Sequence, residues 1–149
     1  MNDDCVFIDT NIWIYGIVES NDPAEIVKRG IILSLFETIV SQNELVVSTQ
    51  ILNECHWNLI RKFGYADSEV FNRIEQNIIK ICKVIDITQR TYGDAFRIRG
   101  KYNISFWDSL VVASAMEGGC VVIHTEDMQH NQKLDNLVIK NPFIRDSVG

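Results

Sequence analysis

The sequence has few prolines and lacks any segment with the composition of a linker. Pro23 and Pro142 are its only prolines, and no stretch is repetitive or rich in proline, glycine and serine together. Flexible linkers and low-complexity tracts have such compositions. Their absence predicts one continuous domain over residues 1–149, with long helices.

Long apolar runs and an amino-terminal basic segment are also missing. No run approaches the roughly 18 apolar residues that a membrane-spanning helix needs. The first 25 residues hold six acids and no lysine or arginine, whereas a secretory signal begins with basic residues. We therefore expect a cytoplasmic protein that does not associate with membranes.

The four cysteines lack the spacing of a metal site. Cys5, Cys55, Cys82 and Cys120 form no CxxC pair, and most of them lie in apolar runs. Reduced, buried thiols are the favoured interpretation, and a zinc site or a disulfide framework is the alternative.

The charge is acidic overall but unevenly distributed. The net charge is −6, which argues against non-specific binding of a polyanion. The residues after position 25 carry 14 acids and 14 bases and are therefore neutral. A local basic strip includes Asp94 as its only acid, and its bases are candidates for contacts with phosphate: Arg90, Arg97, Arg99 and Lys101.

Apolar patterns predict strands that alternate with helices. Continuous rather than alternating apolarity indicates strands of a parallel sheet that is covered on both faces. We expect strands at 5–8, 45–47, 81–85 and 121–124, a weaker one at 137–139, and helices beginning near Asn11 and Pro23 and covering 49–63, 68–79, 88–102 and 106–116. This order predicts an α/β fold with a mainly parallel sheet of four to five strands.

Acidic residues fall where such folds bind ligands, beyond the carboxyl ends of the strands. Asp9 directly follows the first strand, where it is either a ligand or a helix cap. Glu54 lies at the edge of the apolar stripe of its helix, so it either faces a cleft or is simply solvated. Asp108 shares a helix face with Val111 and Val112, and a buried carboxylate needs a helix N-terminus, hydrogen bonds or a cation. The alternative is a purely structural role for Asp108, in a capping box with Ser105.

A fourth group of acids, Glu126 and Asp127, follows the strand that ends at His124. Two like charges at about 4 Å repel by roughly 4 kcal/mol at an effective dielectric constant of 20, so clustered carboxylates either protonate or bind cations. Oxygen ligands without histidine or cysteine favour Mg²⁺ or Mn²⁺. Such ions activate water and neutralise phosphoryl groups, which predicts phosphodiester hydrolysis.

At these residues the sequence resembles PIN-domain ribonucleases, in particular the VapC-type toxins of toxin–antitoxin pairs. The resemblance covers essentially the whole chain and rests on the order and spacing of FIDTNIWIY, STQILNE, ISFWDSLVVASA, GGCVVIHTEDMQHNQKL and LVIKNPF. It implies a three-layer α/β/α sandwich. One departure is Gln129, which stands where many members have a second acid, and it leaves the contribution of Glu126 in doubt.

The resemblance also implies roles for individual residues. Asp9, Glu54, Asp108 and Asp127 would be the catalytic acids and would bind Mg²⁺ or Mn²⁺ directly or through water. Asn11, Ser48 and Thr125 would orient these carboxylates. An RNA substrate, a cognate antitoxin that inserts a segment into the site, and a homodimer are implied as partners.

Two other functions compete with this interpretation. A haloacid-dehalogenase-like phosphatase would also use Asp9, but it needs a second aspartate where Asn11 stands. A PIN fold retained as a binding or scaffolding module would be expected to lose acids, and all four are present.

Histidine and tryptophan side chains are weaker candidates for function. His56, His124 and His130 show no nucleophile–base pattern and are expected to be structural or merely polar. Tryptophans can stack on bases, but packing in the core or in an interface is the interpretation we favour for all three: Trp13, Trp57 and Trp107.

Overall fold

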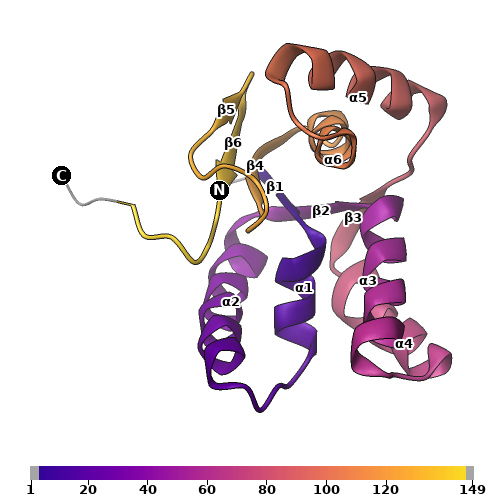
Figure 1. The fold of residues 1–149 in the computed structure, drawn as a ribbon, viewed down its shortest axis with the longest axis vertical. Helices are drawn as coiled ribbons and strands as arrows, with labels where there is room; N and C mark the ends of the chain where they lie inside the picture. The colour runs from indigo at the N-terminus through magenta and orange to yellow at the C-terminus, as the bar shows by residue number, and fades with distance from the viewer. Residues whose placement is uncertain (1–3, 147–149) are drawn as a thin grey trace.

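The computed structural model describes residues 4–146, in which helices cover both faces of a six-stranded sheet (Figure 1). The ends of the expected domain, residues 1–3 and 147–149, lie outside this range. The strand order is β3-β2-β1-β4-β6-β5, and only β5 runs antiparallel to its neighbour. The strands are β1 (Cys5–Ile8), β2 (Glu44–Ser48), β3 (Cys82–Ile85), β4 (Cys120–His124), β5 (Lys133–Leu134) and β6 (Leu137–Lys140).

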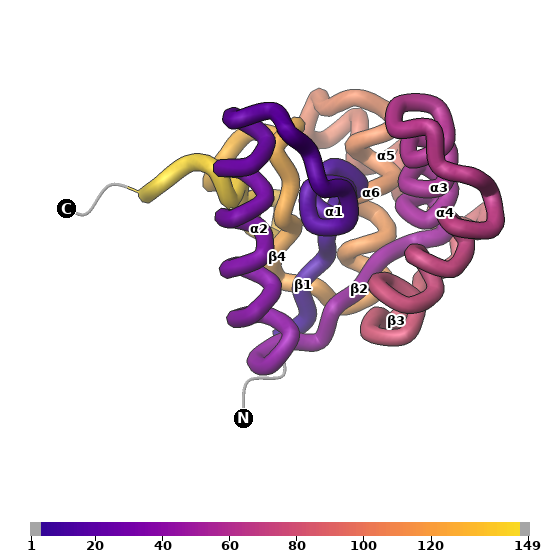
Figure 2. Tube along the Cα trace, turned by 90° about the horizontal axis from the view of Figure 1, so that it is seen from below, coloured from indigo at the N-terminus to yellow at the C-terminus, as the bar shows by residue number. Residues whose placement is uncertain are grey.

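The helices form two layers, one on each side of the sheet. In Figure 1, α1 to α4 lie below the strands and α5 and α6 lie above them, and the view from below in Figure 2 brings α1 to the front with α6 behind it. This is the expected three-layer α/β/α sandwich. The helices are α1 (Thr10–Ile17), α2 (Pro23–Gln42), α3 (Thr49–Phe63), α4 (Asp67–Ile74), α5 (Gln89–Tyr102) and α6 (Phe106–Glu117).

The buried residues of α3 are those that its apolar spacing predicts. Helix α6 has no one-sided apolar pattern, because it is buried on all sides. Helix α3 buries Ile51, Cys55 and Leu59 along a single stripe. Helix α6 is buried all round from Ser109 to Ala115, because small residues let it pack closely between α5 and the sheet. Its buried serines do not go unpaired, since their hydroxyls donate to main-chain carbonyls one turn back.

Two local features differ from the sequence predictions. The helix expected over 68–79 is α4 followed by a π-helical turn, η1 (Glu75–Ile79). The sheet has one strand more than expected, the two-residue β5. Among residues 4–146 no disulfide joins the cysteines: Cys55 and Cys120 are buried as expected, whereas Cys5 and Cys82 are only partly buried. Within that range, no helix combines the length and apolarity that crossing a membrane requires.

The topology places a switch point between β1 and β4. The chain builds β1, β2 and β3 outward in one direction and then returns to add β4 on the other side of β1. The loops that leave the carboxyl ends of β1 and β4 therefore diverge, and such an edge of an open parallel sheet is where ligands bind.

Candidate active site

The Asp9 carboxylate is fixed at this switch point by two hydrogen bonds. Its side chain is buried, with only 8% of the residue surface exposed. Oδ1 accepts from the main-chain N–H of Thr10 at 2.8 Å, and Oδ2 accepts from the Thr125 hydroxyl at 2.7 Å. Asp9 is therefore the N-cap of α1 and is also held by the loop after β4. The capping interpretation and the site interpretation are thus compatible.

Thr125 connects Asp9 with Asp127. Besides donating to Asp9, its buried hydroxyl accepts from the main-chain N–H of Asp127 at 3.1 Å. Asn11 Nδ2 in turn donates to Asp127 Oδ2 at 3.2 Å. Thr125 and Asn11, which the sequence predicts to orient carboxylates, therefore contact Asp9 and Asp127.

Helix starts position the other two acids. Asp108 is half-buried in the first turn of α6, where its main-chain N–H donates to the Ser105 hydroxyl at 3.1 Å. Ser48 is the N-cap of α3, and in the described chain its hydroxyl accepts from Ile51 N–H rather than contacting an acid. Ser48 thus orients the helix that carries Glu54.

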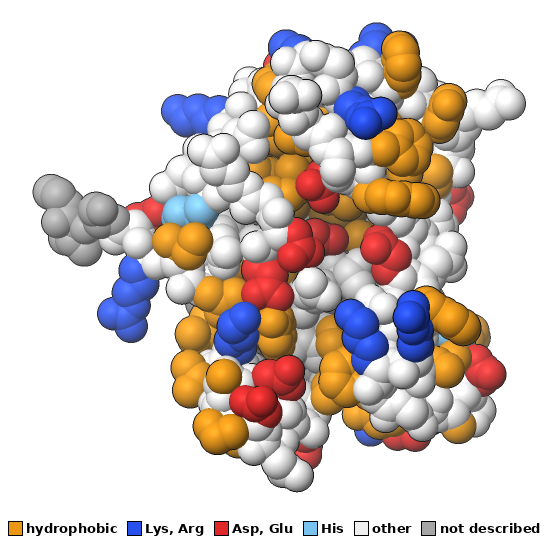
Figure 3. All heavy atoms as spheres, viewed as in Figure 1, with side chains coloured by type: hydrophobic (Ala, Val, Ile, Leu, Met, Phe, Trp, Pro, Cys, Tyr) orange, Lys and Arg blue, Asp and Glu red, His pale blue; other side chains and the backbone are white. Residues whose placement is uncertain are grey.

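The four predicted acids lie within range of one another's charge, because each of them either feels or exerts an electrostatic influence on another. Loss of hydration is the main cause that raises the pKa of Asp9. The two hydrogen bonds lower this pKa, and the charges of Asp127 and Asp108 raise it. Desolvation and then the charge of Asp9 raise the pKa of Glu54, although this side chain reaches the surface. Figure 3 shows acidic side chains gathered in the hollow at the centre of this face, with basic side chains along its lower border.

Asp127 has a raised pKa for the same reasons. Desolvation is the largest cause, followed by the charges of Glu126 and Asp108, while Lys62 lowers the value. Carboxylates whose ionised forms destabilise one another either take up protons or attract a cation. Among residues 4–146, however, no three acidic, histidine or cysteine side chains are close enough to form a ready-made metal site.

Glu126 belongs to a separate cluster beside the acids. Tyr15 donates its hydroxyl to Glu126 Oε1 at 2.8 Å, and Lys28 Nζ lies 3.1 Å from Oε2. Lys28 also lies over the rings of Tyr15 and Phe143, at 5.2 and 4.9 Å from their centroids. Glu126 therefore has a cationic partner and a hydroxyl donor of its own, although its charge still raises the pKa of Asp127. No sequence signal reveals this cluster, because Lys28 and Glu126 are 98 residues apart.

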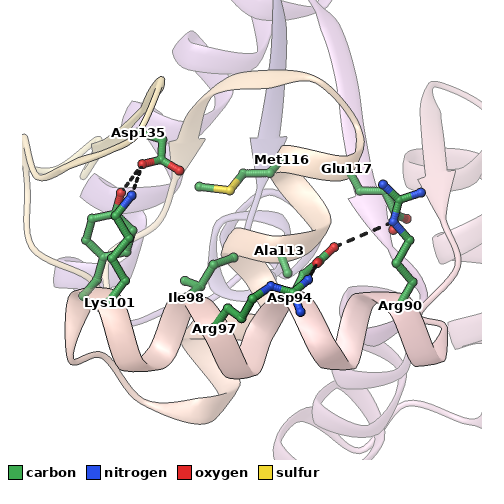
Figure 4. A pocket seen from close by; sticks show the side chains of 10 residues that line it. Arg90, Asp94, Arg97, Ile98, Lys101, Ala113, Met116, Glu117 and Asp135 are labelled. Atoms are coloured by element: carbon green, nitrogen blue, oxygen red, sulfur yellow. Dashed lines mark hydrogen bonds and ion pairs between the residues drawn. The ribbon is translucent and has the colours of Figure 1, made fainter.

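The basic residues suggested for phosphate contact lie on α5, at a different pocket. This pocket of about 340 Å³ lies between α5, α6 and Asp135, and none of the four acids lines it (Figure 4). Asp94 pairs with Arg90 at 4.0 Å and also with Arg97. Lys101 Nζ lies 2.8 Å from Asp135, whereas Arg99 is exposed near Phe96. A role in RNA binding stays a prediction for these four.

The histidines and tryptophans separate into structural and exposed residues. Burial, aided by Lys140, lowers the pKa of His124 to about 4, so this side chain is neutral at pH 7. His56 and His130 hydrogen-bond with carboxylates outside the site.

Trp13 lies in the core, as expected, and donates to the Ile8 carbonyl at 3.2 Å. For Trp57 and Trp107, which are 59% and 66% exposed, the core alternative is wrong, and packing in an interface stays a prediction.

Comparisons with known proteins agree with this architecture. A model of the PIN domain family matches residues 6–133. Among solved structures, the VapC20 toxin of Mycobacterium tuberculosis, described as cleaving the sarcin–ricin loop, superposes with a TM-score of 0.64 at 18% identity, over 82% of this chain and 89% of that one. A DNA-bound VapBC of Salmonella typhimurium gives 0.65 at 18%, over 95% and 99% of the two chains. A promoter-bound VapBC2 of Rickettsia felis gives 0.63 at 16%, over 92% and 98%. A search of curated sequences finds no significant match.

Proposed function

The chain belongs to the PIN domain family, and we propose that it is a metal-dependent endoribonuclease and the toxin of a toxin–antitoxin pair. One observation carries the proposal: acids from four separate segments lie near the switch point of the sheet, where desolvation and the charges of neighbouring acids raise the pKa values of Asp9, Glu54 and Asp127. Its relative from M. tuberculosis is described as a toxin that cleaves an RNA loop. Solved toxin–antitoxin complexes share the fold.

The donor set suits a hydrated Mg²⁺ or Mn²⁺ ion. All four side chains offer oxygen, and Mg²⁺ is usually held by only one or two carboxylates while its remaining ligands are water or phosphate oxygens. Within residues 4–146, no three acidic, histidine or cysteine side chains lie within direct reach of one ion, which is consistent with this mode of binding. Asp9 and Asp108 would hold the ion directly, with Glu54 and Asp127 acting through water. When bound, the ion would activate water and neutralise the phosphate.

Groups of the chain itself would orient the carboxylates and accept a proton from water. Thr125 and the Thr10 N–H hold Asp9 in one orientation, and Asn11 does the same for Asp127. Glu54 is exposed beside them with a raised pKa. Its carboxylate is therefore suited to accept a proton from the attacking water at neutral pH.

The partners that we propose are a cognate antitoxin and a second copy of the chain. A basic side chain of an antitoxin would pair with the acids that the site leaves uncompensated. Apolar side chains exposed on α2 offer a surface for dimerisation: Ile26, Val27, Ile31, Leu33 and Val40. Sedimentation of the purified chain, alone and with a candidate antitoxin, tests both partners.

Cleavage of a panel of structured RNAs by the purified chain tests the enzymatic proposal. We expect cutting with Mg²⁺ or Mn²⁺, none with EDTA, and a loss of roughly 100-fold or more in Asp9→Asn, which removes one electrostatic group from the site. Circular dichroism checks that the variant is folded. Equal cleavage by Asp9→Asn would contradict the metal mechanism. A folded wild-type chain that neither cuts RNA nor gains thermal stability with Mn²⁺ would instead favour a binding or scaffolding module.

A further inference from the structure

A groove of about 520 Å³ opens directly beside the acids. Glu54 belongs to both the groove and the acidic cluster, and Trp107 of the groove immediately precedes Asp108. The groove lies between the first turns of α3 and α6 and the loop after β3. Its other lining residues are Thr49, Gln50, Asn53, Ile87, Trp107 and Leu110.

Trp107 gives this groove a large exposed aromatic surface. The Trp107 residue is 66% exposed. Phe106 packs against it edge-on, with ring centroids 5.5 Å apart, and Tyr92 supports Phe106 at 6.0 Å. The indole is thus supported by two further rings while most of its surface stays open to a ligand.

Apart from Trp107 and Glu54, the residues that line the groove are uncharged. Ile87 and Leu110 supply apolar surface, and Gln50 and Asn53 supply amides. The Ile87 N–H donates to the Thr49 hydroxyl at 3.1 Å, which ties the loop after β3 to the start of α3. Glu54 is the only charged residue in the lining, so the groove disfavours a phosphate. A planar, neutral group with polar edges matches it better.

We propose that this groove is a subsite for an unpaired nucleobase next to the scissile phosphate, with Trp107 as the stacking platform. The inference rests on the proposed function and narrows its substrate to RNA in which the base beside the cut is unstacked, as in a loop or a single strand. Stacking on an aromatic side chain accepts any base, whereas the amide of Asn53 can distinguish base edges.

Steady-state cleavage by Trp107 variants is the first test. Loss of one stacking contact should raise KM by roughly 5- to 100-fold in Trp107→Ala, with kcat changed little. Trp107→Phe should recover most of the affinity because it retains an aromatic face. Phe71→Ala is the matched control, since Phe71 is 60% exposed on α4 and does not line the groove.

Binding without cleavage is the second test. In EDTA, a pentauridine oligonucleotide should quench the indole fluorescence of a Trp57→Phe protein, which retains Trp107 and the buried Trp13. The quenching should be absent in the Trp57→Phe, Trp107→Ala protein. The same sugar–phosphate backbone without bases should cause none, which separates recognition of a base from recognition of phosphate.

The outcomes distinguish this inference from the proposed function. If wild type cleaves RNA but Trp107→Ala has the same KM, or if the base-free backbone quenches equally, the subsite is wrong and the nuclease stands. A fall in kcat alone would assign Trp107 only to holding Asp108 in place, which also overturns the inference. Weaker antitoxin binding with unchanged RNA binding would make the groove a protein-docking site. If wild type cleaves no RNA, the proposed function itself fails.

Discussion

At the residue scale, Glu126 and Asp127 are chain neighbours with opposite surroundings. Glu126 has a lysine and a tyrosine as partners, whereas Asp127 accepts from Asn11 and is exposed to the charges of Glu126 and Asp108. We therefore propose that Asp127, which lacks a cationic partner at hydrogen-bonding distance among residues 4–146, contributes to cation binding and that Glu126 does not. Gln129, which left the role of Glu126 open in the sequence, is consistent with a single functional acid in this loop.

Amide substitutions at these two positions should have different effects. Asp127→Asn should lower the single-turnover rate of RNA cleavage by roughly 100-fold, because it removes one of the carboxylates that we propose to hold the metal ion. Glu126→Gln should leave that rate nearly unchanged. It should lower the free energy of unfolding by about 1 kcal/mol or less, because its ion pair is partly exposed. Urea denaturation measures the second effect. A large activity loss in Glu126→Gln would place Glu126 in the machinery.

The sequence predicts individual acids better than their partners. Asp9 and Asp108 are recognisable because a carboxylate after a buried strand, or on a buried helix face, is unfavourable unless hydrogen bonds, a helix N-terminus or a cation stabilise it. The Thr125 hydroxyl is harder to interpret, since its contacts with Asp9 and the Asp127 N–H depend on how two loops meet. The exposure of Trp107 could not be predicted, because tryptophan is usually packed away and only the tertiary structure leaves this one open.

At the scale of elements, N-caps fix the helix that carries an acid. The Ser105 hydroxyl accepts from the Asp108 N–H and thereby sets the first turn of α6. The Thr88 hydroxyl caps α5 in the same way through Thr91, but α5 carries none of the four acids. The two caps therefore form a natural pair in which stability and activity can be separated.

Removing each cap should cost stability equally but activity unequally. Ser105→Ala and Thr88→Ala should each lower the free energy of unfolding by about 1 kcal/mol. Only Ser105→Ala should also slow cleavage, by roughly 10-fold, because a shift of about 1 Å in the position of Asp108 weakens catalysis. Ser105→Asp, which retains a capping acceptor, should restore the unfolding free energy. Equal activity in the two alanine variants would mean that the cap does not position Asp108.

Helices and strands with strong periodicity could be predicted, and short or irregular ones could not. The boundaries of α3 agree with its predicted range of 49–63, because the stripe, the Ser48 cap and Gly64 in the left-handed conformation all coincide. Strand β5 contains two residues and carries no pattern of its own. The π-helical turn of η1 continues the apolar spacing of α4, so the sequence alone reads both as one helix.

At the scale of the whole molecule, the fold brings negatively charged carboxylates close together, and their mutual repulsion destabilises the folded state. Raised pKa values mean that the folded state binds protons on Asp9, Glu54 and Asp127 more tightly than the unfolded chain does. Stability contributed by these groups is therefore lost as the pH rises from their ordinary values of about 4 through their raised values. His124 acts in the opposite sense, because its lowered pKa makes the folded state resist protonation below about pH 6.5.

A comparison with Asp9→Asn isolates the acids, because His124 is common to both proteins. In EDTA, the unfolding free energy of Asp9→Asn minus that of wild type should increase as the pH rises from 4.5 to 8, since only wild type acquires the buried charge. Saturating Mn²⁺ at pH 8 should reverse the difference, because an ion that binds the native acids stabilises wild type by RT ln(1 + [Mn²⁺]/Kd). Urea denaturation across this range measures both effects. A difference that is independent of pH and of Mn²⁺ would mean that Asp9 is only the cap of α1, and a metal site at the switch point would then have no energetic basis.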